Sequence, residues 1–331
     1  MKYWLYILVV FFGCKGVNNS ITLVHNVGFA QGTSYSIKYM ASDNQDFHHQ
    51  IDSIFAEIDN SLSTYIPQSL ISQLNTGDTS LILDTHFVRV FKAAQQLSNL
   101  SSGLFDCTVN PLVDAWGFGE NQKKDLDSIA IIELLNKVGY REVYLKGDSL
   151  ISNPLLRTLN FNAIAQGYTV DVIAEYLNAQ SVTDYLIEVG GELRSKGLNS
   201  RNKSWRVGID KPSNEIDKND RFQIVINLNN KSLATSGNYR KYYEKDGQIY
   251  SHTINPKTAY PVQHSLLSAT VIADDCMMAD AYATTFMVMG VEQTQEFLKS
   301  HPELEVFLIY TDEDNQWKNW FTDGFKSLVI N

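Results

Sequence analysis

Two oxygen-bearing side chains lie four residues apart in the C-terminal third of this chain. Asp280 and Thr284 belong to the segment ADDCMMADAYATTFMVMG (273–290), which is expected to be helical. At this spacing both side chains project from one helix face. A carboxylate and a hydroxyl can hold a hard cation such as Mg²⁺. His252 precedes them in YSHTINPKTAYP (250–261), and a cation beside a histidine can cleave a phosphate bond.

The N-terminus predicts where this chemistry takes place. Residues 1–13 read MKYWLYILVVFFG and are followed by Cys14. The apolar run is too short to span a bilayer and has the size of the apolar region of a signal peptide. A cysteine after such a run resembles a bacterial lipoprotein signal, although Phe11 departs from the usual leucine. We expect cleavage before Cys14 and its lipidation; an ordinary signal peptide or a short anchor is the alternative.

The remaining composition is that of a globular protein beside a membrane. Residues 1–19 would be signal and tether, and residues 20–331 would form the folded domain. The formal net charge of −10 and the 19% of charged residues suggest no nucleic-acid partner. Cys107 and Cys276 could form a disulfide in an oxidising compartment or stay as two free buried thiols. We expect the domain in the bacterial cell envelope, lipid-anchored on the periplasmic or extracytoplasmic side.

Apolar periodicity predicts a mixture of helices and strands. Helical spacing occurs at 51–62, 87–97 and 170–177. Strands are expected at 34–40, 185–189, 205–209, 221–228, 266–273 and 306–310. Several of these strands follow one another without a helix between them. An α+β fold with largely antiparallel sheets and packed helices is therefore favoured over a doubly wound one.

Several segments interrupt these patterns, and each has a structural and a functional interpretation. Tyr65 could stack on a flat ring or be a core tyrosine. Asp106 could bind a ligand or cap a turn. The corner Ala163–Gly167 could place helix N–H groups beside a phosphate. Gly190-Gly191 could form a bulge or allow a cofactor close to the backbone.

The order of seven motifs is more specific than any one of them. These are LSTYIPQSLISQLN, FDCTVNPLVDAWGFG, NAIAQGYTVD, EVGGELR, TSGNYR, HTINPKTAYP and ADAYATTFMVMG. Together they resemble the ApbE family, the FAD:protein FMN transferases, over about residues 28–325. The resemblance implies a single two-lobed, T-fold-like domain that binds FAD and Mg²⁺. It also implies transfer of FMN to a threonine or serine hydroxyl of an acceptor protein, with release of AMP.

The resemblance also implies roles for particular residues. Asp280 and Thr284 would bind the metal through their side chains, and Ala163 through its carbonyl. His252 would deprotonate the acceptor hydroxyl, with Asp280 the second catalytic residue. Contacts to FAD are implied for Gln31, Tyr65, Leu104, Phe105, Asp106, Asn160, Gln166, Thr253 and Ile254. The expected acceptor is a flavoprotein subunit of a membrane redox complex.

Four positions depart from the family pattern. Asn160 and Gln166 are neutral where the family usually has charged residues, Gln31 stands in place of methionine, and Ala259 in place of glycine. We expect FAD and metal binding to persist with altered affinity. Two other functions remain compatible with these residues: an FAD pyrophosphatase that yields FMN and AMP, and a non-catalytic FAD-binding lipoprotein.

Overall fold

A computed structural model describes most of the chain after residue 20. The described residues are 21–42, 45–78, 80–118, 126–147, 149–152, 158–212, 221–238, 242–245, 248–251 and 253–330, with the backbone alone at 242–245 and 248–251. Within these ranges, no helix has the length and apolar character needed to cross a membrane.

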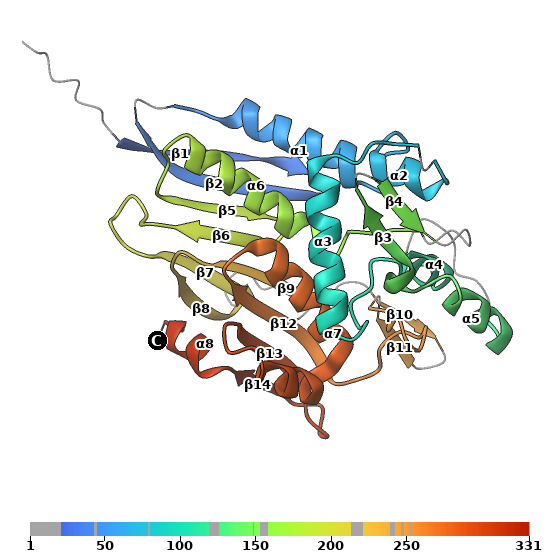
Figure 1. Cartoon of the computed structure of the whole chain (residues 1–331). Helices are drawn as coiled ribbons and strands as arrows, with labels where there is room; N and C mark the ends of the chain where they lie inside the picture. Colours follow the sequence, from blue (N-terminus) through green and yellow to red (C-terminus); the bar gives the residue numbers. More distant parts are fainter. Residues whose placement is uncertain are drawn as a thin grey trace, which may run out of the picture.

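An eight-stranded antiparallel sheet forms the centre of the molecule (Figure 1). Its strands, in spatial order, are β1 (Ile21–Ala30), β2 (Thr33–Ser42), β5 (Tyr185–Val189), β6 (Glu192–Lys196), β9 (Ser232–Gly237), β12 (Leu266–Ala273), β13 (Glu305–Thr311) and β14 (Trp317–Phe321). Strands from both halves of the chain therefore meet at the β6–β9 pair, where Leu193 lies opposite Leu233.

Long helices cover one face of this sheet (Figure 1). They are α1 (His48–Leu62), α3 (Thr85–Leu100), α6 (Ala165–Ala179) and α7 (Cys276–Leu298). Their apolar stripes and the inward side chains of the strands form the main core, which contains Ile37, Ile58, Phe87 and Phe286. The polypeptide departs from helical geometry at Gly290, whose φ of 76° divides α7 in two.

The opposite face is covered by a smaller layer. The hairpin of β7 (Trp205–Asp210) and β8 (Phe222–Leu228) packs there with α8 (Asp323–Leu328). Ile226, Leu228 and Phe325 are fully buried in this second cluster. Because both faces carry apolar side chains, the central strands are buried on both sides, as in a three-layer arrangement.

A second lobe surrounds a third apolar cluster. Leu112, Trp116, Ile131, Ile254 and Ala259 form its buried part. The short elements of this region and of the adjoining segments are α2 (Leu70–Asn75), α4 (Asn110–Ala115), α5 (Ser128–Leu135), η1 (Tyr140–Glu142), and the hairpins β3 (Val143–Lys146) with β4 (Ser149–Ser152) and β10 (Tyr242–Lys245) with β11 (Gln248–Ser251).

The predicted α+β class is confirmed, because every pair of described strands is antiparallel. The three helices predicted from periodicity correspond to α1, α3 and α6, and the predicted strand 266–273 is β12. The edge strand β1 was not predicted. Cys107 and Cys276 are both free and buried.

The Gly190-Gly191 pair does not form a bulge. It is the two-residue turn of the β5–β6 hairpin, with φ of 69° and 120°. Positive φ at both central residues is the geometry that tight hairpin turns require and that glycine adopts readily.

Candidate active site

The start of α7 is held by two carboxylates. Asp275 is the N-cap, and its side chain accepts a hydrogen bond from the amide of Met278. Asp171 in α6 accepts hydrogen bonds from the amides of Cys276 and Met277 at 2.9 and 2.8 Å and pairs with Arg194 of β6. Negative charge at a helix N-terminus is favourable. The first turn of α7 is thereby fixed against α6 and the sheet.

Asp280 lies one turn further along α7 and faces the start of α6. Its Oδ2 accepts a hydrogen bond from the amide of Gly167 at 3.1 Å. A Cβ on Gly167 would lie 2.8 Å from the Cβ of Asp280 and 2.3 Å from the carbonyl oxygen of Cys276. Only glycine permits this approach of the two helices. Burial raises the pKa of Asp280 to about 7, against the opposing effect of the Gly167 hydrogen bond.

The other two predicted metal ligands lie on α7 and in the turn before α6. Thr284 follows it on α7, and its hydroxyl lies 3.1 Å from that of Ser236 in β9. Ala163 lies in the turn before α6. The Gly167 amide, the usual helical partner of the carbonyl four residues earlier, donates to Asp280. In the described part of the chain the Ala163 carbonyl therefore has no such partner and can act as an oxygen ligand.

A second buried carboxylate supports a cation at this place. Glu192 is 7% exposed, and its Oε2 has no hydrogen-bond partner. Burial, and then the negative charge of Asp280, raise the pKa of Glu192 well above its ordinary value. Unpaired buried carboxylates are costly unless a cation joins them.

The predicted ligand set of carboxylate, hydroxyl and carbonyl oxygens suits Mg²⁺. Among the described residues, no group of three or more His, Cys, Asp or Glu could hold a metal ion. The predicted site therefore needs the Ala163 carbonyl and the Thr284 hydroxyl as ligands in addition to Asp280.

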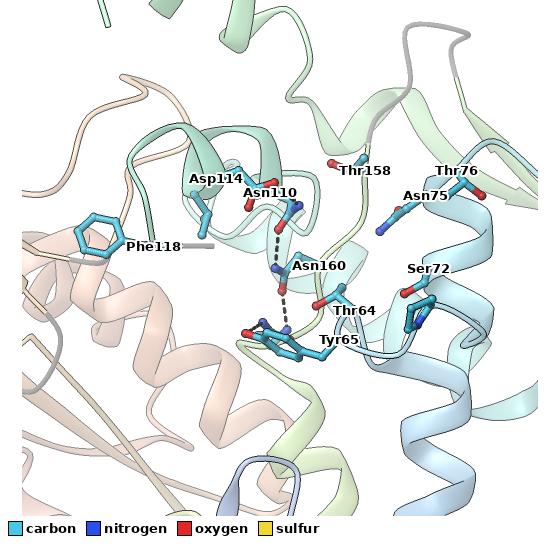
Figure 2. Close-up of a pocket in the computed structure, with 13 residues that line it drawn as sticks. Thr64, Tyr65, Ser72, Asn75, Thr76, Asn110, Asp114, Phe118, Thr158 and Asn160 are labelled. Carbon is cyan, nitrogen blue, oxygen red and sulfur yellow. Dashed lines mark hydrogen bonds between the residues drawn. The ribbon is translucent and has the colours of Figure 1, made fainter. Parts of the chain in front are cut away.

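A polar cavity of about 400 Å³ is lined in part by residues that directly precede the Ala163–Gly167 corner in the chain. Figure 2 shows this cavity. Its walls come from the segment after α1, from α2, from α4 and from residues 158–162. They are lined by Thr64, Tyr65, Pro67, Ser72, Asn75, Thr76, Asn110, Val113, Asp114, Phe118, Thr158, Asn160 and Asn162. Tyr65 is 68% exposed, which excludes its interpretation as a core tyrosine.

The cavity wall is ordered by amide hydrogen bonds. Asn160 donates to Asn110 at 2.7 Å and accepts from the amide of Asn162 at 2.8 Å (Figure 2). Asn75 bonds both backbone groups of Leu159, at 2.7 and 2.8 Å. Asn162 precedes Ala163 directly, so the segment 160–167 connects the cavity with the oxygen donors around Asp280.

Gln31, Gln166 and Asp106 were also predicted to contact FAD, and the structure places the two glutamines together and Asp106 elsewhere. Gln31 donates to Thr169 at 3.0 Å and to Asp59 at 3.2 Å, and the Gln166 side chain reaches the Gln31 carbonyl at 3.5 Å. These residues gather at the start of α6. Asp106, by contrast, accepts from Thr108 and Tyr140, so it caps a turn, which was one of its two predicted roles.

Four further residues were predicted to contact FAD. Leu104, Phe105 and Ile254 are apolar, and Thr253 is polar. Phe105 and Ile254 are buried in the main and third clusters, and Leu104 packs against the main one. The Thr253 hydroxyl donates to Asn238 at 2.8 Å. His252 and Cys14 lie outside the described residues.

Ala259 occupies a backbone conformation that suits glycine. Its φ is 65°, it is fully buried, and its carbonyl accepts a 2.7 Å hydrogen bond from the Trp116 indole. The departure from the family glycine at this position therefore places a side chain in the left-handed region.

Sequence reasoning did not single out Glu192, Asn110 or Asp114. Glu192 follows a glycine pair in EVGGELR, and a charged residue directly after a tight turn gives no indication of burial. Its burial results from the packing of β6 against α7.

Comparison with known proteins identifies the family of this chain. The profile of the ApbE family matches residues 31–308. A protein of Vibrio cholerae named FAD:protein FMN transferase is 34% identical over 99% of both chains, and one of Haemophilus influenzae with that name is 32% identical over 91% of this chain and 90% of its own. The solved structure of the flavin transferase ApbE from Vibrio cholerae superimposes with a TM-score of 0.83 at 32% identity, covering 93% of this chain and all of that chain. The chain belongs to the ApbE family.

Proposed function

We propose that this protein is a flavin transferase that moves FMN from FAD to a threonine or serine hydroxyl of an acceptor protein and releases AMP. The observation that carries the proposal is the continuity between the polar cavity and the oxygen donors. Asn160 and Asn162 line the cavity, and Gly167, five residues after Asn162, donates a hydrogen bond to Asp280. The names of the curated relatives support the same activity.

The residues of the chain suit a magnesium-dependent version of this reaction. Asp280, Thr284 and the Ala163 carbonyl would hold Mg²⁺, which neutralises pyrophosphate charge and stabilises the transition state. Tyr65 would stack on one ring system of FAD in the cavity. The amide side chains of Asn75, Asn110 and Asn160 can hydrogen-bond the ring edges or the ribose.

His252 is proposed as the general base. The acceptor oxygen forms a bond to the phosphorus of the FMN half, and the bond from that phosphorus to the bridging oxygen breaks. AMP leaves with the bridging oxygen, and the hydroxyl proton passes to the imidazole. Replacing His252 with alanine should slow transfer more than it weakens FAD binding.

We propose further that the domain is anchored through a lipid on Cys14, outside the cytoplasm, where it meets a flavoprotein subunit of a membrane redox complex. Strand β1 begins at Ile21, seven residues after Cys14 in the sequence, so such an anchor would hold the domain near the membrane.

One experiment tests the transfer. The purified protein is incubated with FAD and Mg²⁺, with and without a candidate acceptor domain, while AMP release and the acceptor mass are followed together. A mass gain of one FMN, with AMP formed only when the acceptor is present, is expected. AMP formed equally without acceptor and without adduct would identify an FAD pyrophosphatase instead, and stoichiometric FAD binding without AMP, across several acceptors, would identify a binding protein.

A further inference from the structure

Glu192 is a buried carboxylate that the predicted metal set does not include. It is 7% exposed, and its Oε2 makes no hydrogen bond to any described residue. Leaving a charged oxygen buried without a partner is expensive, and native proteins rarely do so without a bound ion, water or ligand. An atom of this kind marks a place where a further group binds.

The hairpin turn before Glu192 brings this oxygen to the start of α6. A Cβ on Gly190 would lie 3.1 Å from Glu192 Oε2, 3.2 Å from Gln166 Nε2 and 2.9 Å from Thr33 Cγ2. Glycine therefore keeps open the space in which these three side chains meet. Gln166 directly precedes Gly167, whose amide bonds Asp280, so the oxygen lies beside the corner that carries the metal donors.

No basic residue in the described structure neutralises the Glu192 carboxylate. Arg194, two residues along β6, pairs with Asp171 instead. The charges that act on Glu192 are negative: Asp280 first, and Glu188 to a smaller extent. The pKa of the Cys276 thiol, in the first turn of α7, is raised by burial and then by the negative charges of Asp171, Glu192 and Asp280. Two buried carboxylates thus face one region between β6, α6 and α7.

We propose that Glu192 is a positioning residue of the cation site, where its Oε2 holds a water of the cation's coordination shell and adds a second buried negative charge beside Asp280. Mg²⁺ retains several of its waters in proteins, and groups that orient a metal's waters and ligands typically change its affinity 10- to 100-fold when they are removed. This inference rests on the proposed magnesium-dependent transfer.

The test measures binding rather than turnover. Glu192→Gln keeps the size and polarity of the side chain but removes its charge. Glu57→Gln removes an exposed carboxylate from helix α1 and serves as the matched control. Wild type and both variants are titrated with Mg²⁺, with and without FAD, by calorimetry and by the shift of the thermal unfolding midpoint.

We expect the Glu192→Gln protein to bind Mg²⁺ roughly 10- to 100-fold more weakly than wild type. Its metal-free unfolding temperature should be at or above that of wild type, because a buried charge has been removed. A carboxylate with a purely structural role would give the opposite stability change and an unaltered Mg²⁺ affinity. Glu57→Gln should match wild type in both measurements.

Equal Mg²⁺ affinity in wild type and Glu192→Gln would overturn the inference while leaving the proposed transfer intact. A wild type that does not respond to Mg²⁺, with or without FAD, would overturn the proposed cation site and the inference with it. Should Glu192→Gln fail to fold, Glu192→Asp keeps the charge on a shorter side chain. It should weaken Mg²⁺ binding without changing the metal-free midpoint, and unchanged binding would contradict the role of the Oε2 position.

Discussion

The amide nitrogen of Gly167 lies 3.1 Å from the Oδ2 of Asp280, a residue 113 positions later in the chain. This contact joins the first turn of α6 to the second turn of α7. It orients one oxygen of the proposed metal ligand and leaves the carbonyl of Ala163 without its usual helical partner.

Thr284→Val should weaken the Mg²⁺ dependence of AMP release. The substitution keeps the shape of the side chain but removes the hydroxyl that faces Ser236 and the proposed site, so the Mg²⁺ concentration for half-maximal rate should rise by roughly 10- to 100-fold. Thr285→Val is the control, because its hydroxyl bonds the Ala281 carbonyl within the helix. Equal Mg²⁺ profiles for the two variants would contradict the assignment of Thr284.

Asp171→Ala should lower the free energy of unfolding by about 3–5 kcal/mol, since it leaves Arg194 and the first amides of α7 without their buried partner. Denaturant titration measures this. Glu175→Gln, on the same helix, breaks an exposed pair with Arg89 and should cost less than about 1 kcal/mol. Similar losses in both variants would show that Asp171 does not anchor α7.

Asp59→Asn should stabilise the protein at pH 7 but not below about pH 4. Burial raises the pKa of Asp59 above its ordinary value of 3.8, against the opposing hydrogen bond from Gln31. The folded state therefore binds more protons than the unfolded state just above pH 3.8, and stability falls as the pH rises through this window. The unfolding temperature is compared at both pH values.

The control for Asp59→Asn is Glu57→Gln, which removes an exposed carboxylate from the same helix. If Asp59→Asn raised the unfolding temperature equally at both pH values, the effect would not come from the titration of Asp59.

Tyr65→Ser should weaken FAD binding through the loss of a stacking surface in the cavity. Stacking of a base on an aromatic side chain is typically worth about 1–3 kcal/mol, or roughly 5- to 150-fold in affinity. Tyr65→Phe keeps the ring and should retain most of the affinity. The flavin fluorescence titration should show no change for Tyr144→Ser, an exposed tyrosine on β3 outside the cavity; weakening by that control would place the flavin elsewhere.

Ala259→Gly should be tolerated much better than Ala174→Gly. Both alanines are fully buried, so both variants lose the same methyl group. Ala259 has a φ of 65°, where a Cβ costs about 1–2 kcal/mol, whereas Ala174 lies within α6, where glycine is unfavourable by about 1 kcal/mol. Denaturant titration should separate the two by at least about 1 kcal/mol, and equal losses would mean that the turn carries no strain.

Local sequence patterns predict most of the helices and strands and the chemistry along one helix. The periodicity of Ile51–Leu62 and Phe87–Leu97 predicted α1 and α3, because a packed helix must present an apolar stripe. The four-residue spacing of Asp280 and Thr284 predicted two oxygens on one face, because the helix repeat alone sets that relation. The antiparallel class followed from strands that succeed one another without helices.

The contacts between distant segments depend on how the whole chain packs. The approach of Gly167 to Asp280 depends on α6 packing on α7, and the burial of Glu192 depends on the place of β6 in the sheet. Neither leaves a local pattern, since the residues next to Glu192 are those of an ordinary hairpin turn. Strand β1 was missed because one of its faces exposes Ile21, Val27 and Phe29, so it lacks the polar alternation of a surface strand. Contacts of this kind arise from chain topology, which local propensity does not encode.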